Sequence, residues 1–207
     1  MAWAPDYATT EELAAYVSIP DDADDVQLAG AIAAASRAID QATGRQFGQL
    51  AVPEARIFPA ELDCRVSRWF VRIDDLMVSP TAVATDPDAD GGFTGDVGTG
   101  FTLGPVNAAS QGRPWDRLDI TSASSYYPGA PDRYVRVTAL WGWSAVPPAI
   151  SQATLLQAAR VFKRRVSPFG IAGPTADSAP TFRLLSRLDP DVEVMVRPYR
   201  RTWGFVA

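Results

Sequence analysis

Residues 135–166 read VRVTALWGWSAVPPAISQATLLQAARVFKRRV, a stretch that holds a strand, a turn and a helix in immediate succession. Arg136 and Thr138 alternate with apolar residues, which predicts a half-buried strand. Pro147 and Pro148 follow the Trp-Gly-Trp turn and favour the start of a helix, because proline suits the first helical turn. The helix is expected over about 149–166. Its apolar residues cover more than one side, so we expect it to be buried.

Two helices are expected upstream of this stretch. Thr9 and Glu12 have the spacing of a capping box, which predicts a short helix that ends near Ile19-Pro20. An acidic linker follows, and the second helix runs to about Thr43 with Gly44 as its stop signal. The large apolar residues of the second helix form one seam on a helical wheel. They are Leu28, Ile32 and Ile39.

Between about Glu54 and Trp143 the pattern changes to β-branched and aromatic runs separated by turns rich in glycine and proline. Strands are expected at 55–58, 68–73, 101–103, 117–120 and 134–141. Residues 86–100 contain five glycines and four aspartates, which predicts an exposed loop tip.

These elements predict an α+β fold, namely a small helical bundle of about four helices with a β-rich insertion between the second and third long helices. A last short helix is expected from the Asp189-Pro190 start signal through Val196. The expected parts are an N-terminal helical part (1–50), the β-rich insertion (51–146), a core helix that completes the helical part (147–169), and a linker with a C-terminal docking segment (170–207).

The composition of the 207 residues excludes several kinds of chemistry. The chain has no histidine, a single cysteine (Cys64) and a single lysine (Lys163). A catalytic triad with histidine, an imidazole metal site and a thiolate zinc site are therefore all excluded. Carboxylates, hydroxyls, arginines and the single lysine remain, a poor set for an enzyme although it suffices for glycosidase or magnesium chemistry. No apolar run is long enough for a membrane span and the first residues do not resemble a signal peptide, so we expect a protein made in the cytoplasm.

The net charge of −5 is unevenly distributed along the chain. Residues 1–40 contain eight acidic residues and one basic residue, whereas residues 151–207 contain nine basic and four acidic residues. Two solvated faces of different sign would explain this pattern. Docking of one end of a subunit on the other end of a neighbour or partner would explain it equally well.

Two acidic motifs could form a metal site or a catalytic site, but a turn explains each of them better. Residues 86–91 match the first half of an EF-hand loop, but Val97 stands where the closing glutamate belongs, so an acidic turn is the better interpretation. Asp74 and Asp75 are neighbours in a strand pattern and would point to opposite faces, so they cannot flank one glycosidic bond. We expect a turn at the end of a strand there.

Two segments are candidates for protein contacts. The second helix is so rich in alanine that another helix could approach closely, although a plain surface helix would look the same. The residues that we expect to pack between subunits are Leu28, Ala31, Ala35 and Ala38. The tail combines arginines with aromatic residues, which are enriched at interface hot spots, although it could also fold back on its own domain. Its residues are Arg197, Tyr199, Arg200, Arg201, Trp203 and Phe205.

Three stretches in this order resemble one family. ATTEELAAYVSI with AGAIAAASRAIDQATGRQF, the 135–173 stretch that contains the Trp-Gly-Trp turn, and DPDVEVMVRPYRR are similar to the head–tail connector proteins of tailed bacteriophages, also called head-completion adaptors. Together they cover about 90 of the 207 residues.

The resemblance implies a structural virion protein of the neck, without catalysis, cofactor or metal. Such adaptors form a ring, usually of twelve subunits, below the portal protein. They extend the channel for double-stranded DNA and present a surface to a tail-side connector, stopper or tail terminator protein. The tail arginines and aromatics would then dock on the portal, and Asp21, Asp22, Asp24 and Asp25 would line the lumen. The alternative is a carbohydrate-acting or carbohydrate-binding β-domain protein, while a pI near 4.7 opposes a nucleic-acid binder.

Overall fold

The computed structural model describes residues 3–20, 22–121, 126–129, 133–164, 171–172, 182–183 and 188–201. The chain divides into two compact units. We call residues 1–47 with 146–207 the helical unit and residues 48–145 the sheet unit. Each unit is described by itself.

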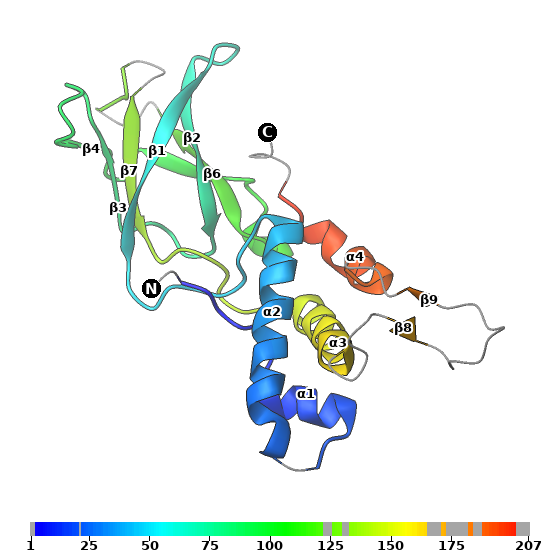
Figure 1. Cartoon of the computed structure of the whole chain (residues 1–207). Coiled ribbons are helices and arrows are strands. Elements are labelled where there is room, and N and C mark those ends of the chain that lie inside the picture. Colours follow the sequence, from blue (N-terminus) through cyan, green and yellow to red (C-terminus); the bar gives the residue numbers. More distant parts are fainter. Residues whose placement is uncertain are drawn as a thin grey trace. The chain divides into compact units, whose positions relative to one another are not determined.

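The helical unit contains four α-helices, which Figure 1 shows: α1 (Thr10–Val17), α2 (Asp25–Thr43), α3 (Pro148–Arg164) and α4 (Pro190–Val196). The predicted end signals are confirmed. The Thr9 hydroxyl accepts from the Glu12 N–H at 3.2 Å, and the Glu12 carboxylate accepts from the Thr9 N–H at 2.9 Å. Gly44 ends α2 in the left-handed conformation, with φ at 65°. The Asp189 carboxylate accepts from the Asp191 N–H at the start of α4.

The core of the helical unit lies between α1, α2 and α3. The predicted seam of α2 is confirmed, since Leu28, Ile32 and Ile39 are all buried. Leu13 of α1 and Phe162 of α3 are buried with them, and small alanines of α2 and α3 fill the space between these large side chains. α4 contributes Val192 and Val196, both fully buried. Burial of these apolar side chains is the main force that holds the helices together.

The sheet unit is a seven-stranded antiparallel sheet in the order β4-β3-β7-β1-β2-β6-β5, and Figure 1 shows it curled into a half-barrel. The long central strand β1 pairs with β7 through its first half and with β2 through its second half. The strands are β1 (Glu54–Asp63), β2 (Arg68–Leu76), β3 (Ala82–Thr85), β4 (Gly95–Asp96), β5 (Phe101–Gly104), β6 (Trp115–Ile120) and β7 (Tyr134–Ala139). A two-residue pair, β8 (Ile171–Ala172) with β9 (Phe182–Arg183), lies in the C-terminal part of the chain.

The sheet unit has a core of its own. Alternate residues of the long strands point into it, as the 134–141 pattern predicts. Trp141 is buried, its indole N–H donates to the Glu54 carbonyl at 2.8 Å, and its ring lies 5.4 Å from the Phe58 ring. The backbone of Trp141 and Gly142 bridges to Leu76 at the end of β2. The turn after β7 therefore draws two strand ends together.

The structure corrects the predicted fold class. The helical bundle with a β-rich insertion is wrong, because the strands form one continuous seven-stranded sheet with a separate core, and this strand-rich body organises the fold. Two strands of the large sheet were missed. β3 is short and rich in alanine, and β4 is a single pair of residues within the predicted exposed tip. Val97 at the end of that segment is buried in the sheet core.

Candidate assembly surfaces

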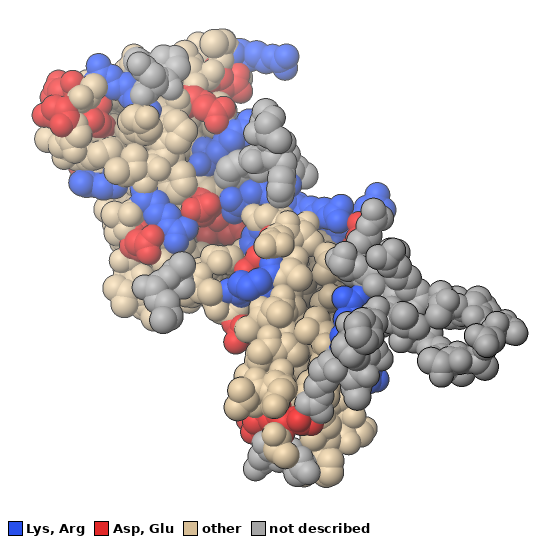
Figure 2. Space-filling view, viewed as in Figure 1, with Lys and Arg blue, Asp and Glu red and all other residues tan. Residues whose placement is uncertain are grey.

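One side of α2 is exposed and almost uncharged, and we call it the open face of α2. Val26 is 84% exposed, and Gly30 and Ala34 follow it at helical spacing. A methyl group added at Gly30 would meet no atom within 4 Å. Figure 2 shows an uncharged surface over this part of the helix. Glycine in the middle of a helix costs about 0.5–1 kcal/mol relative to alanine, and nothing in the described fold requires it here.

The residues expected to pack between subunits lie mostly elsewhere on α2. Leu28, Ala31 and Ala35 are buried in the core of the helical unit, against α1 and α3. Ala38 is half-buried at the edge of that core. The periodicity located an apolar side of α2 correctly but could not tell whether the same chain or a second copy covers it.

The acidic segment before α2 is only partly described. Asp21 lies outside the described residues, and Asp22 begins a single 3-10 turn, η1 (Asp22–Asp24). Asp24 occupies the N-cap position of α2 without a hydrogen bond from its side chain to the helix, and Asp25 is exposed in the first turn. Their negative charge is favourable beside the positive end of the helix dipole.

The C-terminal residues that are candidates for protein contacts begin on the short 3-10 turn η3 (Arg197–Tyr199), directly after α4. Arg197 and Arg200 are exposed, and Arg200 forms an ion pair with Glu193 at 3.1 Å. The Tyr199 ring packs edge-on against Phe47 at 5.8 Å, and the Arg201 N–H donates to the Thr43 carbonyl at 2.8 Å. Trp203 and Phe205 lie outside the described residues.

Residues near the N-terminal and the C-terminal end of the described chain meet at the C-terminal end of α2. The Phe47 ring stands edge-on to the Tyr7 ring on one side, at 5.5 Å, as well as to Tyr199. The Tyr7 hydroxyl donates to Asp40 and accepts from the Phe47 N–H. Arg37 forms an ion pair with Asp40 at 3.1 Å. Sequence reasoning missed this cluster, because Tyr7 and Tyr199 are far apart in the chain and no local pattern connects them.

Burial controls the proton affinity of this cluster. Removal from water raises the pKa of the Asp40 carboxyl, although the Tyr7 hydroxyl and the Arg37 guanidinium oppose the shift by favouring the ionised form. Burial, together with the hydrogen bond to Asp40, also raises the pKa of the Tyr7 hydroxyl. The hydroxyl therefore keeps its proton and stays a donor around neutral pH.

The two neighbouring aspartates of the sheet unit do not form a catalytic pair. Asp74 and Asp75 lie within β2, not in the strand-end turn that we expected. Asp74 forms an ion pair with Arg56 at 2.8 Å, whereas Asp75 is buried and accepts from the Trp143 indole N–H at 2.8 Å. Asp75 thus anchors the Trp-Gly-Trp turn, a role that the sequence did not indicate.

The acidic loop after β3 is organised by its own backbone. The buried Asp86 carboxylate accepts from the N–H groups of Asp90 and Gly91, at 3.2 and 2.9 Å. Such contacts are typical of an aspartate that holds a turn.

Among the described residues, no group of three or more acidic or cysteine side chains is arranged to hold a metal ion. No helix within the described part of the chain is long and apolar enough to cross a membrane.

The fold has known structural neighbours. The neck of an empty gene transfer agent (GTA) particle, computed with C6 symmetry, contains a chain that matches 100% of this chain and 96% of its own length, with 21% identity and a TM-score of 0.59. The neck of the native particle computed with C12 symmetry matches with the same identity and a TM-score of 0.48. In the native virion the match covers 96% of this chain and 91% of that chain, with a TM-score of 0.47.

The first of these matches shows that the two chains have a similar fold. No family model and no curated protein sequence matches this chain.

Proposed function

We propose that this chain is a structural protein of the neck of a phage-like particle, where it serves as a head–tail connector. The observation that carries the proposal is the similar fold of a chain in the neck of a gene transfer agent particle, matched over 100% of this chain and 96% of that chain. Partial matches often reflect a common domain in proteins of different function, whereas this match includes both units. The resemblance of three stretches to head-completion adaptors supports the same role.

The proposed connector is a ring, and the open face of α2 supports its assembly from copies of this chain. The neck of the neighbour was computed with sixfold symmetry, and rings arise from head-to-tail contacts between different surfaces of identical subunits. Glycine at position 30 lowers the stability of the helix, and no contact among the described residues requires glycine there. The open space beside Gly30 would let the backbone of a second subunit approach closely. We therefore place the subunit contact at Val26, Gly30 and Ala34, beside the buried residues that the sequence indicated. We expect twelve subunits, the usual number in the head-completion adaptors that this chain resembles.

The C-terminal segment is the proposed contact with the portal protein. Arg197 and Arg200 are exposed and present positive charge, while Tyr199 and Arg201 hold the segment against α2. In this arrangement the two exposed arginines, with Trp203 and Phe205, dock on the portal, and Tyr199 and Arg201 position them. Arginine and aromatic side chains are enriched at interface hot spots, which suits this role.

The acidic segment at Asp21, Asp22, Asp24 and Asp25 is the proposed lumen wall. DNA must pass through a neck channel without binding to it, and negative charge repels the phosphate backbone. The opposite face of the ring would then contact a tail-side connector, stopper or tail terminator protein. The chain needs no catalytic residue, cofactor or metal for any of these roles.

The test of the proposed function uses the portal protein encoded by the same genome. The full-length chain is mixed with portal rings, and the mixture is examined by sedimentation and negative-stain electron microscopy. We expect a ring of this chain on one end of the portal, and loss of the ring with R197E/R200E. The matched control is R65E/R113E, which reverses the charge of two exposed arginines in the sheet unit and so changes the net charge equally.

A wild-type chain that never associates with portal rings would contradict the connector function. Removal of residues 202–207 should weaken docking while leaving Tyr199 and Arg201 on α2. If a chain without residues 197–207 still docks fully, the C-terminal segment is not the contact.

A further inference from the structure

The sheet unit has a pocket that the proposed neck function does not use. It lies where the turn between β1 and β2 meets the end of β6, and its volume is about 470 Å³. Volumes of roughly 300–1,000 Å³ are typical of sites that bind small ligands. The pocket is lined by Val66, Ser67, Arg68, Trp69, Ile120 and Tyr127, and we call it the Trp69–Tyr127 pocket.

One part of the pocket is aromatic. Tyr127 is 40% exposed, and its hydroxyl donates to the Thr121 carbonyl at 3.3 Å, which limits how far the ring can turn. Trp69 is half-buried because its ring also packs against the sheet core. An aromatic ring held in this way offers a flat apolar face without a large loss of side-chain entropy on binding. The accessible lining of the pocket is mostly polar, with a smaller aromatic part, so the pocket suits a polar ligand that has one flat apolar side.

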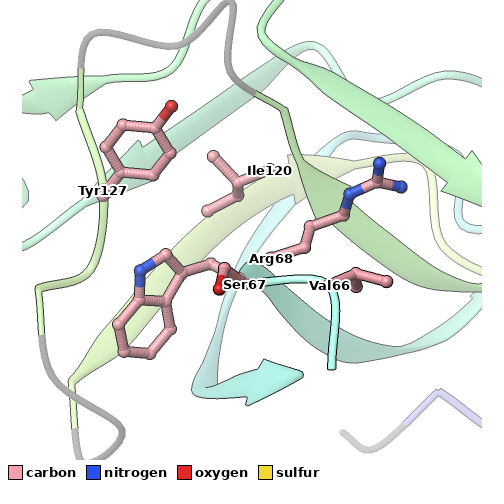
Figure 3. A pocket seen from close by; sticks show the side chains of 6 residues that line it. Val66, Ser67, Arg68, Ile120 and Tyr127 are labelled. Carbon is pink, nitrogen blue, oxygen red and sulfur yellow. The ribbon is translucent and has the colours of Figure 1, made fainter. Parts of the chain in front are cut away.

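The other part of the pocket carries a cation. Figure 3 shows Tyr127 and the Arg68 guanidinium on opposite sides of Ile120. Arg68 is exposed and its side chain makes no hydrogen bond or ion pair with any other described residue. Its neighbour across the strand pair is Asp63, whose carboxylate accepts from the Arg65 N–H at 3.0 Å within the turn. The guanidinium is thus available to a carboxylate on a ligand.

The turn that carries these residues is held in an unusual conformation. Ser67 has φ at 49°, in the left-handed region that non-glycine residues seldom adopt. This conformation precedes Arg68 at the start of β2, and Ser67 forms part of the pocket wall. The pocket thus combines a flat apolar surface, a hydroxyl and an available positive charge.

We propose that the Trp69–Tyr127 pocket binds a saccharide unit that carries one carboxylate. The apolar C–H face of a sugar ring fits an aromatic surface, its hydroxyls can bond with Ser67, and its carboxylate can pair with Arg68. A nucleic-acid strand fits less well, because it needs several cations along the groove and the protein has a net charge of −5. This inference is independent of the proposed function.

The test measures saccharide binding to the full-length protein by isothermal titration calorimetry. The acidic probe is a tetrasaccharide of alternating glucuronate and N-acetylglucosamine, and the neutral probe is chitotetraose. The variants are R68Q and Y127A, both at exposed positions. Their matched controls are R113Q and Y134A, which change an exposed arginine and an exposed tyrosine outside the pocket.

We expect saturable binding of the acidic probe by the wild-type protein and by both controls. Loss of a hydrogen bond to a charged group should make R68Q bind this probe about 10- to 100-fold more weakly, with no change for the neutral probe. Y127A should weaken both probes. The proposal is overturned if the wild type shows no saturable binding, if R68Q and Y127A bind like the controls, or if an oligothymidylate binds more tightly than the acidic saccharide.

Discussion

Substitution of Gly30 separates the stability of the helical unit from its assembly. In G30A the new methyl group enters open space, since no atom lies within 4 Å of its position. The backbone is helical there, so the substitution gains helix propensity without strain. We expect G30A to be about 0.5–1 kcal/mol more stable than the wild type, measured by urea denaturation followed by circular dichroism.

A large side chain at the same position should act on assembly alone. We expect G30W to fold, because the indole would project from the open face of α2, and to form no rings on portal, because a second helix could no longer approach. Q152W is the matched control, an exposed substitution on α3. Ring formation is scored by native mass spectrometry and electron microscopy. Rings of normal size with G30W, or a loss of stability in G30A, would refute this reasoning.

Three further predictions concern groups that are buried or capped. W143F removes the indole donor from the buried Asp75, which should destabilise the sheet unit by about 1–3 kcal/mol in urea denaturation; an unchanged midpoint would contradict the anchoring role. T9A removes the cap of α1 and should cost about 1 kcal/mol, whereas T9S, which keeps the hydroxyl, should retain most of the stability. Burial raises the pKa of Asp40, so the folded protein binds this proton more tightly than the unfolded chain does. The stability of the wild type relative to D40N should therefore rise on acidification through the interval between the folded and unfolded pKa values of Asp40, and a difference that falls would show the opposite shift.

The helix ends were predictable because their signals are local. The capping box at Thr9 and Glu12, the glycine at position 44 and the Asp189-Pro190 start each depend on residues within one helical turn. The buried seam of α2 was predictable for the same reason, since periodicity is a property of the helix itself.

The sheet was not predictable to the same extent, because its pairing is long-range. β1 pairs with β7, which follows it only after five other strands, in a register that joins Glu54 to Ala139 and Pro59 to Tyr134. β3 has a weak strand pattern and exists because β7 offers it an edge. The predicted contacts between subunits show the same limit of local patterns. Periodicity showed that α2 has an apolar side, but the partner that covers Leu28, Ala31 and Ala35 is the rest of the same unit.

The meeting point at the end of α2 has a mechanical consequence. The Arg201 N–H is tied to the Thr43 carbonyl and the Tyr199 carbonyl to the Arg45 guanidinium, while Tyr7 is wedged against Phe47 from the other side. A pull on the chain beyond residue 201 would load these bonds in the last turn of α2 before it reached α4. Tension applied at the C-terminal segment would therefore act first on the end of α2.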